Sequence, residues 1–264
     1  MDNFRFKKRF GQNFISDTNF LKSLVAAAGV GKSDNVLEIG AGAGSLTREL
    51  CAAARFVASF EIDRELEPAL NAALSGLDNV RLVFADALKA SEAEITSLFN
   101  SQFKLVANLP YYITTPLIFK FLEMRPCAEM AVMVQREVAD RLTAKEGTEE
   151  YGALTAAVAV AADVKILKRV SRKLFYPPPD VDSAFVSIKR NDKFAVADRA
   201  VLSRLIKCAF AMRRKTLANN LMSGFSMERA AAESLLASVG LPANIRGEAL
   251  SPAKFVELAN AMHE

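Results

Sequence analysis

The hydrophobic positions of the chain form short apolar runs that alternate with longer segments of helical spacing. Seven runs predict strands, at residues 36–39, 56–60, 80–84, 103–107, 130–134, 164–167 and 184–188. The spacing between them predicts helices at residues 18–28, 45–54, 135–144 and 153–162, with further helices that end at 74 and begin at 115. Strands joined by crossover helices build mostly parallel sheets with helices on both faces. The pattern therefore predicts an α/β protein with a Rossmann-like, seven-stranded sheet.

The pattern changes after Arg190. Three helical segments follow, without a strand pattern among them, at residues 198–222, 226–239 and 251–262. The last begins with Ser251-Pro252, a capping residue followed by a proline at the first helical position. We therefore expect two domains: residues 1–190, which include an N-terminal arm at 1–14, and a small all-helical domain at 191–264.

The composition excludes several classes of protein. With 264 residues, 51% of them hydrophobic, the chain can build a sizeable core, but no apolar run has the length of a bilayer span and no apolar signal segment follows the N-terminus. Cys51, Cys127 and Cys208 lie far apart without CxxC spacing, and the only histidine is His263. We therefore expect a cytoplasmic protein with reduced thiols, no membrane contact and no metal site, whose chemistry does not use histidine.

The net charge of +4 is modest but unevenly spread. Basic residues concentrate at 5–9, 165–173 and 199–215. Such clusters near aromatic residues are typical of polyanion-binding surfaces, although ordinary solvated helix faces also carry them. In the N-terminal arm, basic side chains alternate with phenylalanines, so the arm could lie on phosphates and stack on bases, or its phenylalanines could dock on the main domain. We leave both interpretations open.

Glycines and acidic residues mark the ends of the predicted strands. A glycine loop at residues 40–44 follows the first strand, Glu61 ends the second, and Asp86 and Asn108 follow the third and fourth. Ligands bind at the carboxyl ends of such strands, and Glu61 is placed to accept both hydroxyls of a ribose. This set suits NAD, S-adenosylmethionine or ATP. The GxGxG spacing, the missing GK[ST] ending and the acidic rim favour S-adenosylmethionine, because its sulfonium is a cation.

The sequence Asn108-Leu109-Pro110-Tyr111 follows the fourth strand. The amide oxygen of Asn108 and the backbone oxygen of Pro110 can accept the two N–H groups of an amine, while the Tyr111 ring stacks on a flat heterocycle. Asparagine and proline are also common in turns, so the segment alone is equally compatible with a proline turn. The residues upstream favour the ligand-binding interpretation.

Several motifs together resemble the rRNA adenine dimethyltransferase family, and within it the bacterial small-subunit (16S) members, over nearly the whole chain. They are Gly11-Gln12-Asn13-Phe14, Glu38-Ile39-Gly40-Ala41-Gly42, Glu61-Ile62-Asp63, Asn108-Leu109-Pro110-Tyr111, Phe175-Tyr176-Pro177-Pro178-Pro179 with Val181-Asp182-Ser183, and Arg213-Arg214-Lys215-Thr216-Leu217. The chain departs from the usual pattern at Ile15, where leucine is usual, and at Ala41, where proline is frequent. Both positions act through the backbone.

The resemblance implies a class I methyltransferase fold and S-adenosylmethionine as the cofactor. The implied cofactor-binding residues are Asn13, Ile15, Gly40, Gly42, Glu61, Ile62, Asp86, Ala87 and Asn108. Glu61 is expected to bind the ribose and Asp86 the adenine amine, and Asn108 to lie where cofactor and target meet. The implied catalytic residues are Asn108, Pro110, Tyr111 and Phe175, with the two aromatic rings on opposite faces of an extruded adenine. The RNA-binding candidates are Arg5, Lys7, Lys8, Arg9, Arg213, Arg214 and Lys215.

The implied partner is small-subunit rRNA in a partly assembled small ribosomal subunit, and the implied process is ribosome biogenesis. We expect the protein to be a monomer. Three alternatives remain. A DNA adenine methyltransferase usually carries Pro where this chain has Leu109, and has a larger recognition domain. A large-subunit rRNA methyltransferase shares the same core. A ribosome-assembly factor would act mainly by binding.

Overall fold

A computed structural model describes residues 13–262 of the chain. The contacts divide it into two compact units. The first comprises the chain up to Ala139 together with Lys165–Lys189, and the second comprises Asp140–Val164 and the chain from Arg190 onward.

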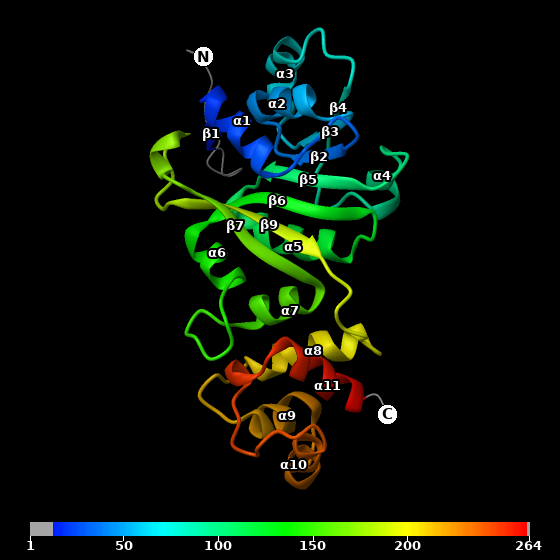
Figure 1. Ribbon diagram of the computed structural model, residues 1–264, viewed down its shortest axis with the longest axis vertical. Coiled ribbons are helices and arrows are strands. Elements are labelled where there is room, and N and C mark those ends of the chain that lie inside the picture. The colour runs from blue at the N-terminus through cyan, green and yellow to red at the C-terminus, as the bar shows by residue number, and fades with distance from the viewer. Residues whose placement is uncertain (1–12, 263–264) are drawn as a thin grey trace. The chain divides into compact units, whose positions relative to one another are not determined.

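A seven-stranded sheet forms the centre of the first unit, in the order β4-β3-β2-β5-β6-β9-β7 (Figure 1). The pairs β4-β3, β3-β2, β2-β5 and β5-β6 are parallel, and β9 runs antiparallel to β6. The strands are β2 (Asn35–Ile39), β3 (Phe56–Glu61), β4 (Val80–Phe84), β5 (Phe103–Asn108), β6 (Cys127–Gln135), β7 (Ala162–Val170) and β9 (Ser183–Arg190). The predicted Rossmann-like fold is confirmed.

Helices cover both faces of this sheet. They are α1 (Thr18–Ala27), α2 (Ser45–Ala53), α3 (Glu67–Ala73), α4 (Glu92–Thr96), α5 (Thr114–Glu123) and α6 (Arg136–Leu142). Leu24 of α1 and Leu50 of α2 share one buried cluster with Val106 of β5. Phe103 of β5 meets Phe121 of α5 edge to face, with 6.4 Å between ring centroids. Because alternate residues of a strand face opposite sides, Phe103 and Val106 assign α5 to the other face.

A separate two-stranded sheet, which the hydrophobic pattern does not predict, pairs β1 (Phe14–Ile15) with β8 (Phe175–Tyr176) in antiparallel register. Phe14 lies opposite Tyr176, and Ile15 lies opposite Phe175. The short helix η4 (Arg172–Leu174) precedes β8. This sheet joins the segment before α1 to the hairpin between β7 and β9.

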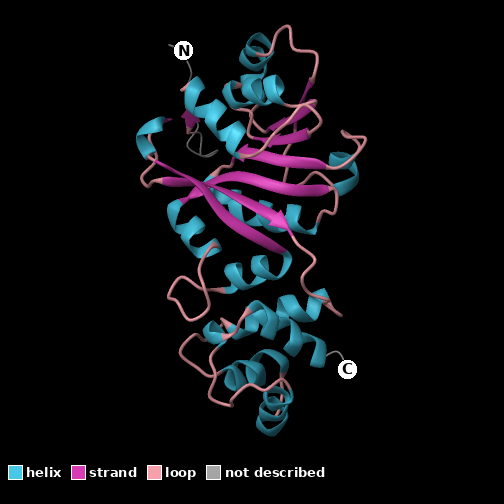
Figure 2. Cartoon of the chain, in the orientation of Figure 1, coloured by secondary structure: helices cyan, strands magenta, loops and turns pink. Residues whose placement is uncertain are grey.

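The second unit is helical (Figure 2). It contains α7 (Ala153–Ala161), α8 (Arg199–Ala209), α9 (Leu217–Phe225), α10 (Arg229–Ser238) and α11 (Pro252–Ala261). The boundary expected at residue 190 does not describe this unit, because Tyr151 and Ala156 share a core with Leu205 and Phe255. The Tyr151 hydroxyl also donates to the Leu250 carbonyl at 2.8 Å. In residues 13–262, no helix has the length and apolar character needed to cross a bilayer.

The prediction of a single helix at residues 198–222 is wrong. The structure has α8 and α9 there, separated by a turn at residues 210–216, and Thr216 caps α9 through the Asn219 N–H. The buried Asn220 amide donates to the carbonyls of Ala209, Met212 and Thr216, and its oxygen accepts the Met212 N–H at 3.1 Å. One buried carboxamide thus fixes the turn.

We expect Asn220→Leu to lower the free energy of unfolding by about 2–4 kcal/mol, because the turn's carbonyls and the Met212 N–H lose their buried partner. Urea denaturation followed by circular dichroism measures this. Ser223→Ala, an exposed position on the same helix, is the matched control and should stay within about 0.5 kcal/mol of the parent. Equal effects of the two substitutions would contradict the role given to Asn220.

Candidate active site

A cavity opens where β2, β3 and β5 end, in agreement with the rule that ligands of parallel sheets bind at the carboxyl ends of strands. The predicted cofactor-binding residues all line it, as do Pro110 and Tyr111; this set is Asn13, Ile15, Gly40, Gly42, Glu61, Ile62, Asp86, Ala87, Asn108, Pro110 and Tyr111. Phe175 does not line the cavity. The sheet thus gathers residues that lie up to 98 positions apart, from Asn13 to Tyr111.

The carboxylate of Glu61 connects the glycine loop to the end of β3. It is 6% exposed. Its Oε2 accepts the Gly42 N–H at 2.9 Å, and its Oε1 accepts the N–H groups of Ile62 and Asp63 at 2.9 and 2.8 Å. Three backbone donors therefore hold the carboxylate in one orientation at the cavity wall, where its remaining lone pairs can accept hydroxyl groups.

The glycine loop needs its glycines for two different reasons. Gly40 has φ of 84° and Gly42 has φ of 57°, a left-handed backbone that glycine adopts without strain. A Cβ on Gly42 would also lie 2.6 Å from the Phe14 ring. Gly42 therefore admits Phe14, whereas at Gly40 the nearest atom to a Cβ would be the Asn108 carbonyl oxygen at 3.8 Å.

Beneath the loop lies Glu38, which has no exposed surface. Its Oε2 accepts the hydroxyls of Thr47 and Ser59, each at 2.6 Å, whereas Oε1 has no hydrogen-bond partner within residues 13–262. Burial raises the pKa of Glu38 to about 7, and the nearby Glu61 adds to the rise. These bonds join β2 to α2 and β3 directly behind the glycine loop.

The loop after β4 carries Asp86 and Ala87. Asp86 Oδ1 accepts the Leu88 N–H at 2.9 Å. Lys120 of α5 reaches the loop from the other side and donates to the carbonyls of Ala87 and Leu88 at 2.8 and 2.9 Å, and to that of Ala90. Partial burial lowers the pKa of Lys120, which Asp86 and Glu94 partly oppose. Lys120 therefore fixes the backbone that presents Asp86.

Asn108, at the end of β5, has a fixed orientation. Its Nδ2 donates to the Asn13 carbonyl at 2.9 Å, so Oδ1 is the amide atom left for a ligand N–H. The Pro110 carbonyl, predicted to accept a second N–H, already accepts the Ile113 N–H and the Thr114 hydroxyl, each at 3.1 Å. Both of its lone pairs are engaged.

Of the two aromatic residues predicted to stack on a base, Tyr111 lines the cavity and Phe175 does not. The Tyr111 hydroxyl lies 2.6 Å from the Ser183 hydroxyl, which anchors the ring to β9, and burial raises the pKa of Tyr111. Phe175 is 3% exposed and belongs to the buried cluster that contains Ile15. Since alternate strand residues face opposite sides, β8 turns Phe175 inward and Tyr176 outward. The structure therefore does not place Phe175 as the second face of a base-binding slot.

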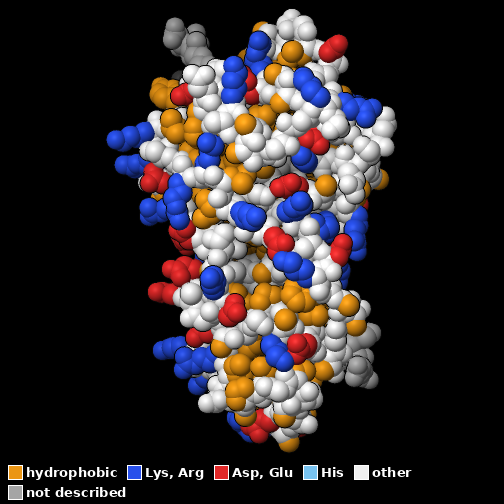
Figure 3. All heavy atoms as spheres, viewed as in Figure 1, with side chains coloured by type: hydrophobic (Ala, Val, Ile, Leu, Met, Phe, Trp, Pro, Cys, Tyr) orange, Lys and Arg blue, Asp and Glu red, His pale blue; other side chains and the backbone are white. Residues whose placement is uncertain are grey.

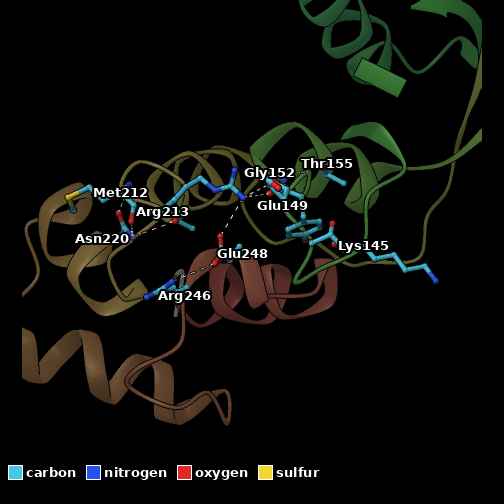
Figure 4. A network of polar contacts seen from close by, with 12 residues as sticks. Lys145, Glu149, Gly152, Thr155, Met212, Arg213, Asn220, Arg246 and Glu248 are labelled. Atoms are coloured by element: carbon cyan, nitrogen blue, oxygen red, sulfur yellow. Dashed lines mark hydrogen bonds and ion pairs between the residues drawn. The ribbon is translucent and has the colours of Figure 1, made fainter. Parts of the chain in front are cut away.

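Arg213, Arg214 and Lys215 lie in the turn between α8 and α9, and not on a basic helix as expected. The Arg213 guanidinium donates to the carbonyls of Glu149 and Tyr151 at 2.9 and 3.3 Å and pairs with Glu248 at 3.4 Å (Figure 4). Arg214 and Lys215 are exposed. Arg213 thus anchors the loop before α7, which contains Glu149 and Tyr151 and belongs to the same unit. Arg5, Lys7, Lys8 and Arg9 lie outside the described residues.

Some lining residues were missed by the sequence reasoning. Phe14 and Tyr112 line the cavity, and Tyr112 is 57% exposed. Lys120 and Ser183 act from behind Asp86 and Tyr111. The second tyrosine of Tyr111-Tyr112 was a visible signal, whereas the contacts of Lys120 and Ser183 join distant segments and leave no local pattern. Residues 13–262 contain no cluster of three or more His, Cys, Asp or Glu side chains suited to a metal ion.

Comparison with known proteins agrees with this geometry. A family model described as "Ribosomal RNA adenine dimethylase" matches residues 3–264. The chain is 44% identical to ribosomal RNA small subunit methyltransferase A of Geobacillus thermodenitrificans, over 98% of this chain and 92% of the relative. It is 42% identical to the protein of the same name from Bacillus cereus, with the same coverage.

Two solved structures are similar over nearly the whole chain. A dimethyladenosine transferase from Plasmodium falciparum has a TM-score of 0.80 and 26% identity, covering 93% of this chain and 95% of that one. The 23S rRNA methyltransferase ErmE has a TM-score of 0.71 and 27% identity, covering 96% of this chain and 100% of that one. The fold and the strand-end site thus define a Rossmann-like methyltransferase, an enzyme. Within that class, the chain belongs to the ribosomal RNA adenine dimethylase family, as the motifs predicted.

We expect the raised pKa of Glu38 to make stability depend on pH. The folded state keeps a proton that the unfolded chain releases above a pKa near 4.5, so the free energy of unfolding should fall as pH rises toward 7, by on the order of 3 kcal/mol. Glu38→Gln removes this titration and should flatten that part of the profile. Urea unfolding at pH 5 and pH 7.5 tests it, and an unchanged pH dependence in Glu38→Gln would refute the assignment.

Proposed function

We propose that this protein transfers methyl groups from S-adenosylmethionine to the exocyclic amino group of adenosines in small-subunit rRNA, twice per adenosine, during ribosome biogenesis. The carrying observation is the fixed carboxamide of Asn108, which presents Oδ1 to the same cavity that contains Glu61 and Asp86. The names of the bacterial relatives support the small subunit.

The residues present fit the cofactor. Glu61 would accept the ribose hydroxyls, Asp86 the adenine amine, and the exposed Ile62 side chain would pack on the adenine ring. Asn13 and the Ile15 backbone would bind the methionine part, beside Gly40. The acidic rim suits a cation and does not suit a pyrophosphate. Ala87, held through its carbonyl by Lys120, would close the adenine side.

When bound, S-adenosylmethionine supplies a methyl group that is already activated by the sulfonium. The protein then has mainly to position the target amine and to exclude water. The amine is a weak nucleophile because its lone pair is delocalised into the adenine ring. Accepting its N–H at Asn108 Oδ1 favours a pyramidal nitrogen and directs the lone pair toward the methyl group.

The second acceptor of the amine follows from the Pro110 contacts. Since the Pro110 carbonyl already accepts two hydrogen bonds, its predicted role requires one of them to break. The neighbouring Leu109 lines the same cavity, and its carbonyl would serve without that loss. Tyr111, anchored through Ser183, would stack on one face of the base. Phe175 would reach the other face only if β8 left its buried cluster.

Two other functions are less well supported. A large-subunit rRNA methyltransferase shares the fold, as the similarity to ErmE shows, but the relatives that are 42–44% identical carry the small-subunit name. An assembly factor that acts by binding alone would not need Asn108 and Glu61 in fixed orientations. Catalysis and an assembly role are compatible. The expectations of a monomer and of a cytoplasmic location stay predictions.

The turn at residues 210–216 is our candidate for binding rRNA. Arg214 and Lys215 project from a turn that Asn220 holds rigid, so two cations are presented to a phosphate backbone with little loss of conformational entropy. Arg213 is committed to Glu149, Tyr151 and Glu248, so its role would be to support the turn.

The function is tested by incubating the protein with labelled S-adenosylmethionine and partly assembled small subunits from cells that lack the enzyme, and then mapping the modified bases. We expect dimethylated adenosines in small-subunit rRNA. Label in large-subunit rRNA alone, or in none, would contradict the proposal.

The same assay separates the roles of two residues. Asn108→Ala should lose most single-turnover methylation, at least about a hundredfold, because the amine is no longer oriented. Glu61→Ala should mainly weaken cofactor binding in isothermal titration. Near-normal turnover of Asn108→Ala with saturating cofactor would overturn its assignment.

Charge reversal tests the turn. Arg214→Glu/Lys215→Glu should weaken rRNA binding and lower the salt dependence of the affinity, without changing cofactor affinity. Lys22→Glu/Arg81→Glu is the matched control, since both residues are exposed on the first unit. Arg213→Ala should instead lower the unfolding temperature. Equal loss of rRNA binding in the control would mean that only the total charge matters.

A further inference from the structure

The basic stretch at residues 165–173 has no part in the proposed site. The structure resolves it into β7 and η4. Because β7 ends the sheet order, β9 is its one neighbour among the described strands. Lys165, Lys168 and Arg169 lie on β7, and Arg172 and Lys173 lie on η4. Lysines on an edge strand also prevent strand pairing between molecules. The basic residues of β7 alone therefore do not distinguish this protective role from the binding of a ligand.

The charges continue beyond the edge strand into the hairpin between β7 and β9. Figure 3 shows Lys and Arg side chains gathered over this hairpin, at the left of the view. Between Val164 and Ser183 the chain has five basic and two acidic residues. One acid, Asp182, uses its Oδ1 to accept the Arg172 N–H at 3.0 Å, so it serves the hairpin's own structure. A strand-protecting role does not require charges beyond the strand.

An exposed aromatic residue accompanies these charges. Tyr176 is 66% exposed and Val181 is 44% exposed, whereas the adjacent Phe175 is buried. Exposed aromatic side chains next to cations are the usual platform for unpaired bases, because any base can stack on the ring while the cations follow the backbone. We call Lys165, Arg169, Arg172, Lys173 and Tyr176, all of which are exposed, the hairpin surface.

The hairpin surface is joined to the cavity by a fixed frame. Tyr176 pairs with Phe14, whose ring lies against Gly42, and Phe175 pairs with Ile15. Within the hairpin, the Arg172 guanidinium donates to the Asp180 carbonyl at 3.1 Å, and Ser171 caps η4 through the Lys173 N–H. A ligand bound to the hairpin surface would therefore meet a preformed site next to Phe14 and Ile15, which line the cavity.

We propose that the hairpin surface binds the single-stranded RNA that flanks the target adenosine, with the lysines and arginines on phosphates and Tyr176 stacked on an unpaired base. This inference rests on the proposed function, since it identifies a second part of the same substrate's binding site. In β8, the exposed Tyr176 would therefore stack on a base, which the buried Phe175 cannot do.

The test measures binding of small-subunit rRNA transcribed in vitro over a range of salt concentrations. Lys165→Ala/Lys173→Ala should weaken binding several-fold and lower the slope of log affinity against log salt by about 1.4, the value for two single-strand phosphate contacts. Lys22→Ala/Lys189→Ala removes the same charge, and Lys189 lies at the end of β9 away from the hairpin. An equal change in this control would overturn the proposal.

Tyr176→Leu should weaken rRNA binding about fivefold or more, whereas Tyr176→Phe should retain it, because stacking needs only the ring. Cofactor affinity should stay unchanged in both, which excludes damage to the Phe14 pairing. Full rRNA binding by Tyr176→Leu would refute the stacking role. Weaker binding to assembled small subunits but not to bare rRNA would show a protein partner and also overturn the proposal. Wild-type methylation in the same preparations distinguishes these outcomes from failure of the proposed function.

Discussion

The carboxylate of Glu61 is the interaction on which the site depends. Its two oxygens accept three backbone N–H groups, one from the glycine loop after β2 and two from the segment after β3. If this carboxylate were removed, the buried Gly42 N–H would lose its acceptor, and an unsatisfied buried donor lowers stability by about 1–3 kcal/mol. The Gly40 N–H has a separate partner, the Phe60 carbonyl at 2.8 Å, so of these two glycines only Gly42 depends on the Glu61 carboxylate. The group expected to bind the ribose is therefore also the group that shapes the loop beside it.

A second layer of polar contacts stands behind each ligand-facing residue. Glu38 binds Thr47 and Ser59 under the glycine loop, and Lys120 holds the backbone around Ala87. Ser183 anchors Tyr111, and the Asn13 carbonyl orients Asn108. Positions held this way lose little entropy on binding, which is what a reaction limited by alignment requires. The arrangement explains why a site formed by loops can be as well defined as one formed by strands.

The sequence predicted the parts of the structure that local patterns determine. All seven strands of the main sheet contain a predicted apolar run. For β2, β3, β5, β6 and β9, which are mostly buried, the reason is that a strand buried on both faces has to be nearly continuously apolar. The edge strands β4 and β7 are largely half-buried and keep only a short run. The break between α8 and α9 was missed because residues 210–216 contain no glycine or proline that would mark a turn. Its cause, Asn220, acts through hydrogen bonds to Ala209 and Met212. The β1-β8 pairing was missed for a similar reason. Two-residue strands carry no periodicity, so Phe175 was assigned to a base-binding face that the pairing turns inward.

The cavity also accounts for proton release without a dedicated base. The acids that line it among the described residues, Glu61 and Asp86, already accept backbone N–H groups. Asn108 and Tyr111 are weak bases, and burial raises the pKa of Tyr111 further, so its neutral form persists. An amine that has just gained a methyl group is a strong acid, and its proton passes to water without help. A site with oriented neutral acceptors, whose carboxylates are proposed to bind the cofactor, therefore has the groups that the proposed transfer needs and avoids a base that would compete for the electrophilic methyl group.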